Sequence, residues 1–233
     1  NTVHSTHIPF SKLKKEIIGK ELTNFRKVFT TCYDLITYWS VFNTISSNKQ
    51  VDFFWRNNTF DSRNVNIFYP AQVTAFYYLH GALHLQTNLA SGIHKLLGAS
   101  DNLPEIDSYK FTELNTVLPL FITEGTSKYK LSKIESNSYL NFCYKELSKI
   151  KNGLVVIGQG LDPTYDQHLV DAIVENEKLT YVAISIYSGL HQDEKERLVK
   201  FFEARLLRRI PQLELFFFES ESHPLCSKDV KGN

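Results

Sequence analysis

The second half of the chain alternates short apolar segments with helical segments, and this alternation limits its possible folds more than any other feature. Apolar runs near 154–157, 179–187 and 213–218 have the length of buried strands. Helical patterns at about 163–176 and 191–209 separate them. Strands that are apolar throughout and alternate with helices are typical of a parallel sheet covered on both faces. We therefore predict an α/β fold with a mainly parallel sheet and helices on both faces.

The first half of the chain extends this pattern around a less regular segment. Residues 27–31 and 73–79 are β-branched and apolar, and we predict them as further strands of the same sheet. Residues 46–117 differ in composition, with Ser, Asn and Asp around short aromatic runs, and indicate a small insertion. Because no repeat or low-complexity linker interrupts the chain, we expect a single domain over 1–233.

The remaining elements follow from hydrophobic spacing and from cap residues. Asp162 and Pro163 suit the cap and the first turn of a helix. The polar tail from Ser220 is expected to fray. Helices are also expected near 11–25, 33–45, 107–117, 127–135 and 138–150, and strands near 82–85, 93–97 and 118–123.

Composition excludes several classes of protein. Lys and Arg number 26 against 25 Asp and Glu, so binding of nucleic acid through bulk positive charge is not expected. No apolar run approaches the roughly 18 residues of a membrane helix, and the N-terminus lacks the apolar core of a signal peptide. Three widely spaced cysteines form neither a disulfide framework nor a zinc pattern. We predict a cytoplasmic protein without a metal, and a start at Asn1 without Met indicates that an N-terminal part is missing.

Ligands of open parallel sheets bind beyond the carboxyl ends of the strands, and that rule selects four segments of this chain. Each follows an apolar strand and carries small or polar residues, which are equally the residues of an ordinary turn. The segments are Thr30–Asp34, His80–His84, Glu124–Ser127 and Gly158–Leu161.

Four side chains near these segments could carry chemistry, and each also has a structural interpretation. His80, followed by Gly81, could approach a ligand and exchange a proton, or could serve a turn. Cys32 could be an activated thiolate or a buried apolar residue. Asp34 and Asp166 could contact a ligand, or belong to a helix turn and to the solvated surface. His80 and His84 lack a third ligand, so a metal site is not expected.

The combination of these segments resembles the sirtuin-like NAD-binding superfamily. Thr30-Thr-Cys-Tyr-Asp34, Leu79-His-Gly81 and Val155-Val-Ile-Gly-Gln-Gly-Leu161, with Asp166 five residues further on, carry the resemblance. Tyr77-Tyr-Leu-His-Gly-Ala-Leu-His-Leu85, Glu124-Gly-Thr-Ser-Lys-Tyr-Lys-Leu131 and Ile186-Tyr-Ser188 are similar to a bacterial sirtuin-like family still described as a domain of unknown function. The resemblance covers about residues 25–220.

The resemblance implies a Rossmann-like domain that binds NAD and hydrolyses it, as NAD glycohydrolases of bacterial anti-phage defence do. The expected partner is therefore a small-molecule nucleotide, and binding to nucleic acid or to a membrane is not expected. Assembly into a homo-oligomer remains open. The resemblance assigns His80, with Cys32, to catalysis, and His80 would be the acid/base facing the ribose. It assigns nucleotide binding, with the adenosine side at Gly158 and Leu161, to these residues: Thr31, Asp34, Gly81, Gly158, Leu161 and Asp166.

Two departures from the superfamily leave the activity open. The Gly-rich segment that holds the pyrophosphate should precede Asn1 and is not in this sequence. Cys32 stands where the superfamily has Asn, and a thiol is a poorer donor and acceptor than an amide. The alternatives to an NAD hydrolase are therefore a catalytically inactive nucleotide-binding sensor and an interaction module that kept only the fold.

Overall fold

In the computed structural model, the described residues are 14–42, 50–54, 58–61, 73–88, 91–96, 111–112 and 115–227. The chain divides into two compact units. The first unit comprises Asn1–Thr123, Lys133–Cys143 and Val230–Asn233, and the second comprises Glu124–Ser132 and Tyr144–Asp229. Each unit has a parallel sheet of its own.

The parallel sheet of the first unit has the order β1-β3-β2. Strand β1 (Lys27–Thr30) and strand β2 (Gln50–Val51) both pair in parallel with β3 (Thr74–Tyr78). All five residues of β3 are buried, as expected for the central strand of a covered sheet. Helix α1 (Lys15–Leu22) precedes β1, and helix α2 (Ile36–Phe42) follows it.

The first unit also has an antiparallel sheet, whose strands come from the predicted insertion and from the residues directly after it. Its order is β5-β4-β7-β6, from Gly92–Lys95, Gly81–Asn88, Asn115–Phe121 and Phe111–Thr112. The predicted helix over 107–117 is therefore wrong for its described residues, which are extended. Pro119 disfavours helical backbone at Leu118, and pairing with β4 then favours a strand.

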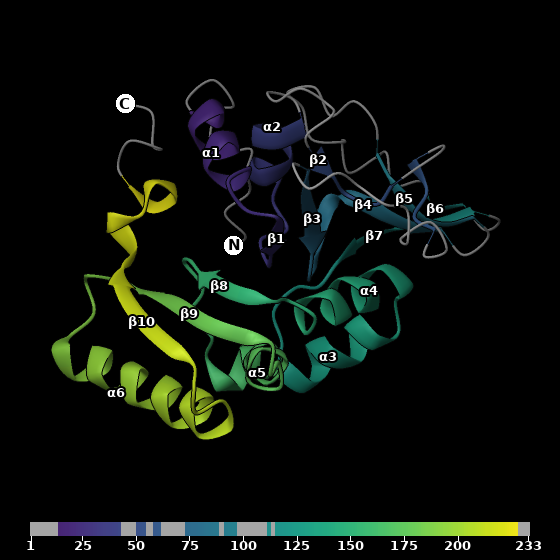
Figure 1. The fold of residues 1–233 in the computed structure, drawn as a ribbon. Coiled ribbons are helices and arrows are strands. Elements are labelled where there is room, and N and C mark those ends of the chain that lie inside the picture. The colour runs from purple at the N-terminus through teal and green to yellow at the C-terminus, as the bar shows by residue number, and fades with distance from the viewer. Residues whose placement is uncertain are drawn as a thin grey trace. The chain divides into compact units, whose positions relative to one another are not determined.

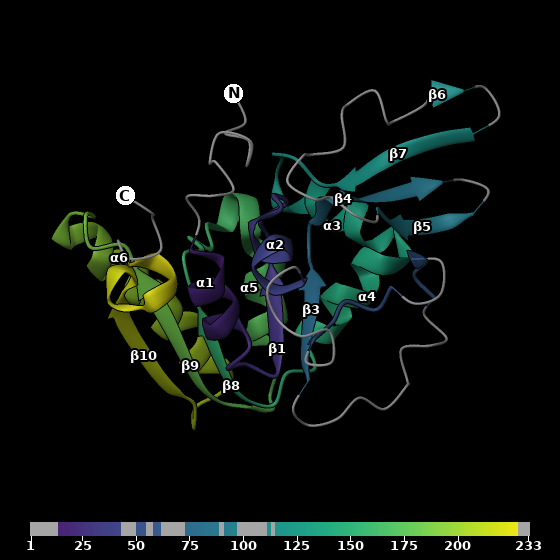
Figure 2. The same ribbon diagram turned by 90° about the horizontal axis from the view of Figure 1, so that it is seen from above.

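The second unit has the parallel sheet β10-β9-β8, formed by Glu214–Glu219, Leu179–Ile186 and Asn152–Val156. Helix α5 (Pro163–Val174) connects β8 to β9, and α6 (Gln192–Phe202) connects β9 to β10 through a π-helical turn, Glu203–Leu207. Figures 1 and 2 show these elements. Helices α3 (Ser127–Glu135) and α4 (Ser138–Leu147) each contribute residues to both units.

Both connecting helices cover the same face of the second sheet. A small cavity of about 10 Å³ lies among side chains of α5, β9, α6 and the π-helical turn: Leu161, Val170, Ile173, Val174, Val182, Ile184, Phe202 and Leu206. On the opposite face of this sheet, Tyr181 and Phe216 are 46% and 51% exposed. Within the second unit, therefore, α5 and α6 lie on the same face of the sheet.

The α/β class is confirmed, but the single sheet is not. The strands at 27–30 and 74–78 pair in one sheet, and those at 152–156, 179–186 and 214–219 pair in another. The apolar pattern identified each of these five strands correctly, because a buried strand is apolar whichever strands it pairs with. It could not predict which strands pair, because pairing depends on long-range contacts.

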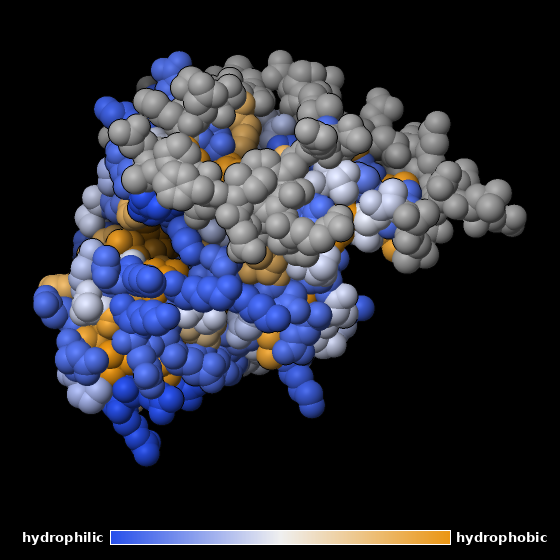
Figure 3. Space-filling model, turned by 45° about the vertical axis from the view of Figure 1, so that its right-hand side comes forward, coloured by the Kyte–Doolittle hydropathy of each residue, from blue (hydrophilic) through white to orange (hydrophobic). Residues whose placement is uncertain are grey.

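The chain remains ordered into short helical turns after β10. Instead of a frayed tail, Ser220–Ser222 and Pro224–Cys226 form short 3-10 helices, and the amide of Leu225 donates to Nδ1 of His223 at 3.2 Å. Most of the coloured surface in Figure 3 is hydrophilic, with smaller hydrophobic areas. Among the described helices, none has the length and apolar character needed to cross a bilayer.

Candidate functional site

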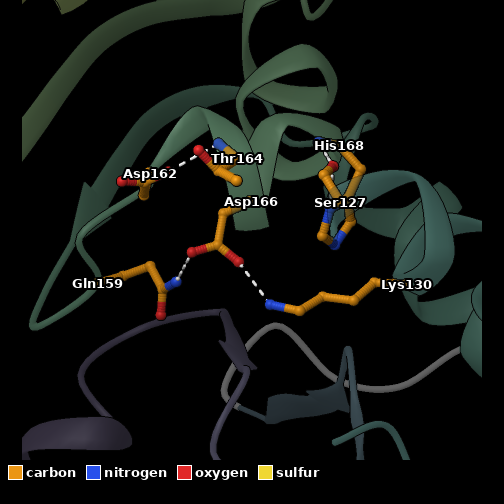
Figure 4. A network of polar contacts seen from close by, with 7 residues as sticks. All are labelled: Ser127, Lys130, Gln159, Asp162, Thr164, Asp166 and His168. Carbon is orange, nitrogen blue, oxygen red and sulfur yellow. Dashed lines mark hydrogen bonds and ion pairs between the residues drawn. The ribbon is translucent and has the colours of Figure 1, made fainter. Parts of the chain in front are cut away.

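The clearest polar network of the second unit lies where β8 ends and α5 begins (Figure 4). Asp162 is the N-cap of α5, as predicted, and its Oδ1 accepts a hydrogen bond from the amide of Thr164 at 2.7 Å. Pro163 occupies the first helical turn, where a missing amide proton costs little. The cap sets the direction of the helix and brings Asp166 to the end of the sheet.

Asp166 is the centre of this network. Its backbone is non-helical, with φ −130° and ψ 16°, and interrupts the first turn of α5. The residue is 8% exposed, so its carboxylate needs partners to offset the cost of burial. Nε2 of Gln159 donates to Oδ2 at 2.8 Å, and Nζ of Lys130 donates to Oδ1 at 3.1 Å. A buried, paired carboxylate therefore lies beyond the carboxyl end of β8.

Beside Asp166, hydrogen bonds between Ser127 and His168 join helix α3 to helix α5. The amide of His168 donates to Oγ of Ser127 at 2.8 Å, and Oγ is 2.9 Å from Nδ1 of the same residue. The direction of this second bond depends on the tautomer of the imidazole. Burial lowers the pKa of His168 to about 4, with Asp166 opposing the shift and Lys130 adding to it. The ring is therefore neutral near pH 7, and Lys130 lies one turn beyond Ser127 on α3.

The loop from Gly158 to Leu161 forms the rest of this edge. Gly158 has a φ of +66°, and its amide donates to Oγ of Ser185 at the end of β9, at 2.9 Å. No neighbour lies within 4 Å of the place where a Cβ would project from Gly158 or Gly160. Leu161, which we predicted to bind nucleotide, has its side chain in the apolar core beside Val170 and Val182.

The corresponding edge of the first unit lies after β1 and β3. The amide of Leu79 donates to the carbonyl of Thr30 at 2.9 Å, and the amide of Leu83 donates to that of Tyr33 at 2.8 Å. These bonds place the segment from Thr31 to Asp34 along the His80 turn. Asp34 is part-buried, and its Oδ1 accepts from the amide of Ile36 at 2.8 Å, which ties the carboxylate to the start of α2.

Cys32 is exposed, but its surroundings do not favour a thiolate. Desolvation of the sulfur raises the pKa of the thiol, and the nearby charge of Asp34 raises it further. A hydrogen bond with Thr30 acts in the opposite direction and is the smaller effect. Desolvation also raises the pKa of Asp34. The Cys32 thiol therefore stays protonated at neutral pH, which argues against the activated nucleophile that the sequence suggested.

His80 and Gly81 are held against strand β7. His80 is 5% exposed, and its carbonyl accepts from the amide of Ile122 at 2.8 Å. Gly81 has a φ of +74°, and a Cβ there would lie 2.2 Å from the carbonyl oxygen of Leu120. We expected this glycine to let a ligand approach closely. The structure shows that it lets the backbone of β7 approach.

His84, the second histidine of this motif, is buried in an aromatic environment. Its ring lies 4.4 Å from that of Tyr38 and 4.9 Å from that of Tyr78. Within the described structure, neither the two ring nitrogens of His84 nor the hydroxyl of Tyr78 have a hydrogen-bond partner. Burial, with the charge of Lys95, lowers the pKa of His84 to about 3. The described residues contain no cluster of three metal-ligating side chains.

The predicted site residues fall into two groups. Thr31, Cys32, Asp34, His80 and Gly81 share one edge of the first unit, whereas Gly158, Leu161 and Asp166 belong to the second unit. The structure brings together the members of each group.

One comparison identifies the family of the chain. Residues 1–226 match the family described as domain of unknown function DUF4917. The chain belongs to this family. No curated protein matches the DUF4917 chain.

Four residues of the network around Asp166 were not predicted as site residues of this DUF4917 chain: Ser127, Lys130, Gln159 and His168. Lys130 and Ser127 lie in the Glu124–Leu131 motif, which carries part of the resemblance but gives these side chains no role. His168 follows Asp166 by two residues, and Gln159 lies between the two glycines of the loop. Ser127 and Gln159 lie within segments that the edge rule selected, whereas Lys130 and His168 lie further along helices α3 and α5. Their pairing across 36 and 41 residues required the tertiary structure.

Proposed function

We propose that this DUF4917 protein binds NAD at the carboxyl ends of its parallel strands and hydrolyses the bond between nicotinamide and ribose. The observation that carries the proposal is the edge shared by β1 and β3. There the Thr31–Asp34 segment and His80 follow adjacent parallel strands whose ends are joined by the bond from Leu79 to Thr30. Parallel α/β sheets bind nucleotides at such edges.

The second unit supports the same proposal. Its three parallel strands and connecting helices form the βαβαβ arrangement from which Rossmann-like dinucleotide folds are built, and we propose that fold for the chain. Gly158 and Asp166 follow β8. As in the resemblance to sirtuin-like proteins, we assign the adenosine half of NAD to Gly158 and Asp166 of this unit.

The proposed chemistry uses the elements of this chain in a simple sequence. The C–N bond breaks, and its electron pair passes to the pyridinium ring, which leaves as neutral nicotinamide. Water adds to C1′ of the oxocarbenium-like ribose and transfers a proton to His80, which releases it to solvent. Fixed dipoles around a cation-like transition state are the usual source of stabilisation for such a step.

A second candidate, nucleotide binding without turnover, is favoured by Cys32. The protonated thiol at this position is a weak donor and a weak acceptor, so it orients water or a carboxamide poorly. Binding draws on many contacts along the dinucleotide and should depend less on this residue. The protein would then act as a sensor of NAD.

Calorimetry with NAD, together with an assay of nicotinamide release, tests both candidates. In the full chain, Cys32→Asn should raise the rate of release while NAD affinity changes little. His80→Ala in that background should reduce the rate about 10²–10⁴-fold. Cys226→Asn and His94→Ala are matched controls on other elements, and both should leave the rate unchanged.

The outcomes separate the candidates. Binding of NAD without release, by wild type and by Cys32→Asn alike, leaves the sensor and excludes the hydrolase. Release that survives both His80→Ala and His80→Gln, in variants that keep the circular dichroism of the parent, excludes the role of His80. Absence of NAD binding in both wild type and Cys32→Asn, measured side by side, excludes both candidates.

A further inference from the structure

The first turn of α5 is closed to anions, although helix starts after parallel strands are common phosphate sites. The amide of Thr164 already donates a hydrogen bond to Oδ1 of Asp162 at 2.7 Å, and Pro163 has no amide proton. The amides of Tyr165 and Asp166 both donate to the carbonyl of Asp162, at 3.0 and 2.7 Å. The carboxylate of Asp166 adds negative charge beside this turn. A phosphate would find repulsion there and no amide to bind.

The same edge suits hydroxyl groups. One carboxylate oxygen of Asp166 accepts a hydrogen bond from Lys130 and the other accepts one from Gln159 (Figure 4). A carboxylate has about four acceptor positions, so capacity remains for further donors. The loop that carries Gln159 is also uncrowded at Gly158 and Gly160, because no atom lies within 4 Å of either Cβ position. A sugar hydroxyl is a donor that such an acceptor can bind without a change of charge.

We infer that this edge of the second unit takes the unphosphorylated ribose of a nucleotide, with Asp166 accepting hydrogen bonds from its hydroxyls and rejecting a phosphate on them. This inference rests on the proposed function, which assigns the adenosine half of NAD to this segment. Asp166 is then the residue that distinguishes NAD from NADP, whose adenosine ribose carries a 2′-phosphate.

The magnitude of the preference follows from the charges. A phosphate dianion placed against a buried carboxylate meets like-charge repulsion, and Lys130 is already paired with that carboxylate. We expect NAD to bind at least about tenfold more tightly than NADP. Asp166→Asn keeps an acceptor for the ribose, removes the negative charge and leaves Lys130 available to the phosphate. The preference should then shrink to less than about threefold.

Calorimetric titration of the full chain with NAD and with NADP tests the inference. Wild type, Asp166→Asn and Asp162→Asn are compared, and circular dichroism verifies that each is folded. Asp162→Asn is the matched control, because it removes the same charge one turn earlier and Asn caps a helix equally well. It should keep the preference for NAD.

Each outcome decides the inference. Equal binding of NAD and NADP by wild type, or tighter binding of NADP, overturns it while the proposed NAD binding stands. An unchanged preference in Asp166→Asn, or a lost one in Asp162→Asn, also overturns it. If wild type binds neither dinucleotide, the proposed function fails together with the inference.

Discussion

Gly81 in the first unit and Gly158 in the second both stand in turns after parallel strands, and both have left-handed backbone, with φ of +74° and +66°. Their surroundings differ. A Cβ on Gly81 would collide with the backbone of Leu120, whereas a Cβ on Gly158 would meet nothing within 4 Å. The same residue type at equivalent places thus serves packing between strands in one unit and leaves open space in the other. A glycine at a strand end indicates close approach, but it does not say by what.

The buried polar groups of the two units differ in a parallel way. His168 and Asp166 in the second unit are both hydrogen-bonded. His84 and Tyr78 in the first unit are packed among rings, and the ring nitrogens and the hydroxyl lack partners in the described structure. Burial lowers the pKa of both histidines, but only the His168 ring is fixed by a hydrogen bond to another element. Removing these polar groups should therefore cost stability in the second unit and little in the first.

Gly81→Ala should have the largest effect on stability. The new Cβ needs a strained φ and would lie 2.2 Å from a backbone oxygen that cannot move without displacing β7. Left-handed strain and overpacking together should cost about 3–5 kcal/mol. Urea unfolding followed by circular dichroism measures the loss. A loss below about 1 kcal/mol would show that β7 yields easily, and the contrast between the two glycines would disappear.

Lys130→Met should destabilise the second unit by about 3 kcal/mol. It leaves the buried Asp166 carboxylate with Gln159 as its side-chain donor, and an incompletely compensated buried charge is costly. Chemical denaturation of Lys130→Met, Asp166→Asn and the double variant measures the coupling between the two side chains.

Lys149→Met is the matched control for this experiment. Lys149 pairs with Glu146 at 2.9 Å, but its side chain is 61% exposed, so the substitution should change stability by less than about 0.5 kcal/mol. Equal losses in the two methionine variants would contradict the view that burial makes the Lys130 pair important.

His84→Phe should flatten the dependence of stability on acid pH. The pKa of His84 is about 3 in the folded chain and near 6.5 in the unfolded chain. Between these values the unfolded state binds more protons, so stability falls as pH falls, by up to about 1.4 kcal/mol per pH unit. Phe cannot titrate and suits the aromatic surroundings, so the variant should lose this part of the slope. Unfolding midpoints from about pH 7 to about pH 4 measure it.

His168→Leu tests the other side of the same comparison. It also removes a titrating group, whose folded pKa is about 4, but it leaves Ser127 without its ring partner. At neutral pH it should destabilise the protein by about 1–3 kcal/mol, whereas His84→Phe should be neutral or stabilising. A larger loss for His84→Phe than for His168→Leu at neutral pH would overturn the proposed difference between the units.

Gly158→Ala should have only a small effect on stability. The open surroundings accept a methyl group, so the cost is that of left-handed backbone for Ala, about 1 kcal/mol. The proposed nucleotide site would lose space, and NAD affinity should fall more than stability does. Calorimetry and denaturation on the same preparation compare the two effects. A loss of several kcal/mol would mean that this glycine, like Gly81, is needed for packing.

The order and type of most elements could be predicted from the sequence. The strands of the second unit and helices α5 and α6 appear within a few residues of the predicted ranges, and Asp162 caps α5 as expected. These features depend on local properties: the period of apolar residues, a capping oxygen and the missing amide of Pro163. The site segments were found for a related reason, because strand ends require polar residues and glycine.

Tertiary structure alone decided how these elements combine. Division of the described strands among three sheets, extended backbone near residue 115, and the role of Gly81 against Leu120 all depend on which strand lies beside which. The ion pair of Lys130 with Asp166 and the bond of Ser127 with His168 join residues far apart in the chain. A sequence determines local preferences at each position. Which distant groups meet, and which buried atoms keep a partner, is decided by packing.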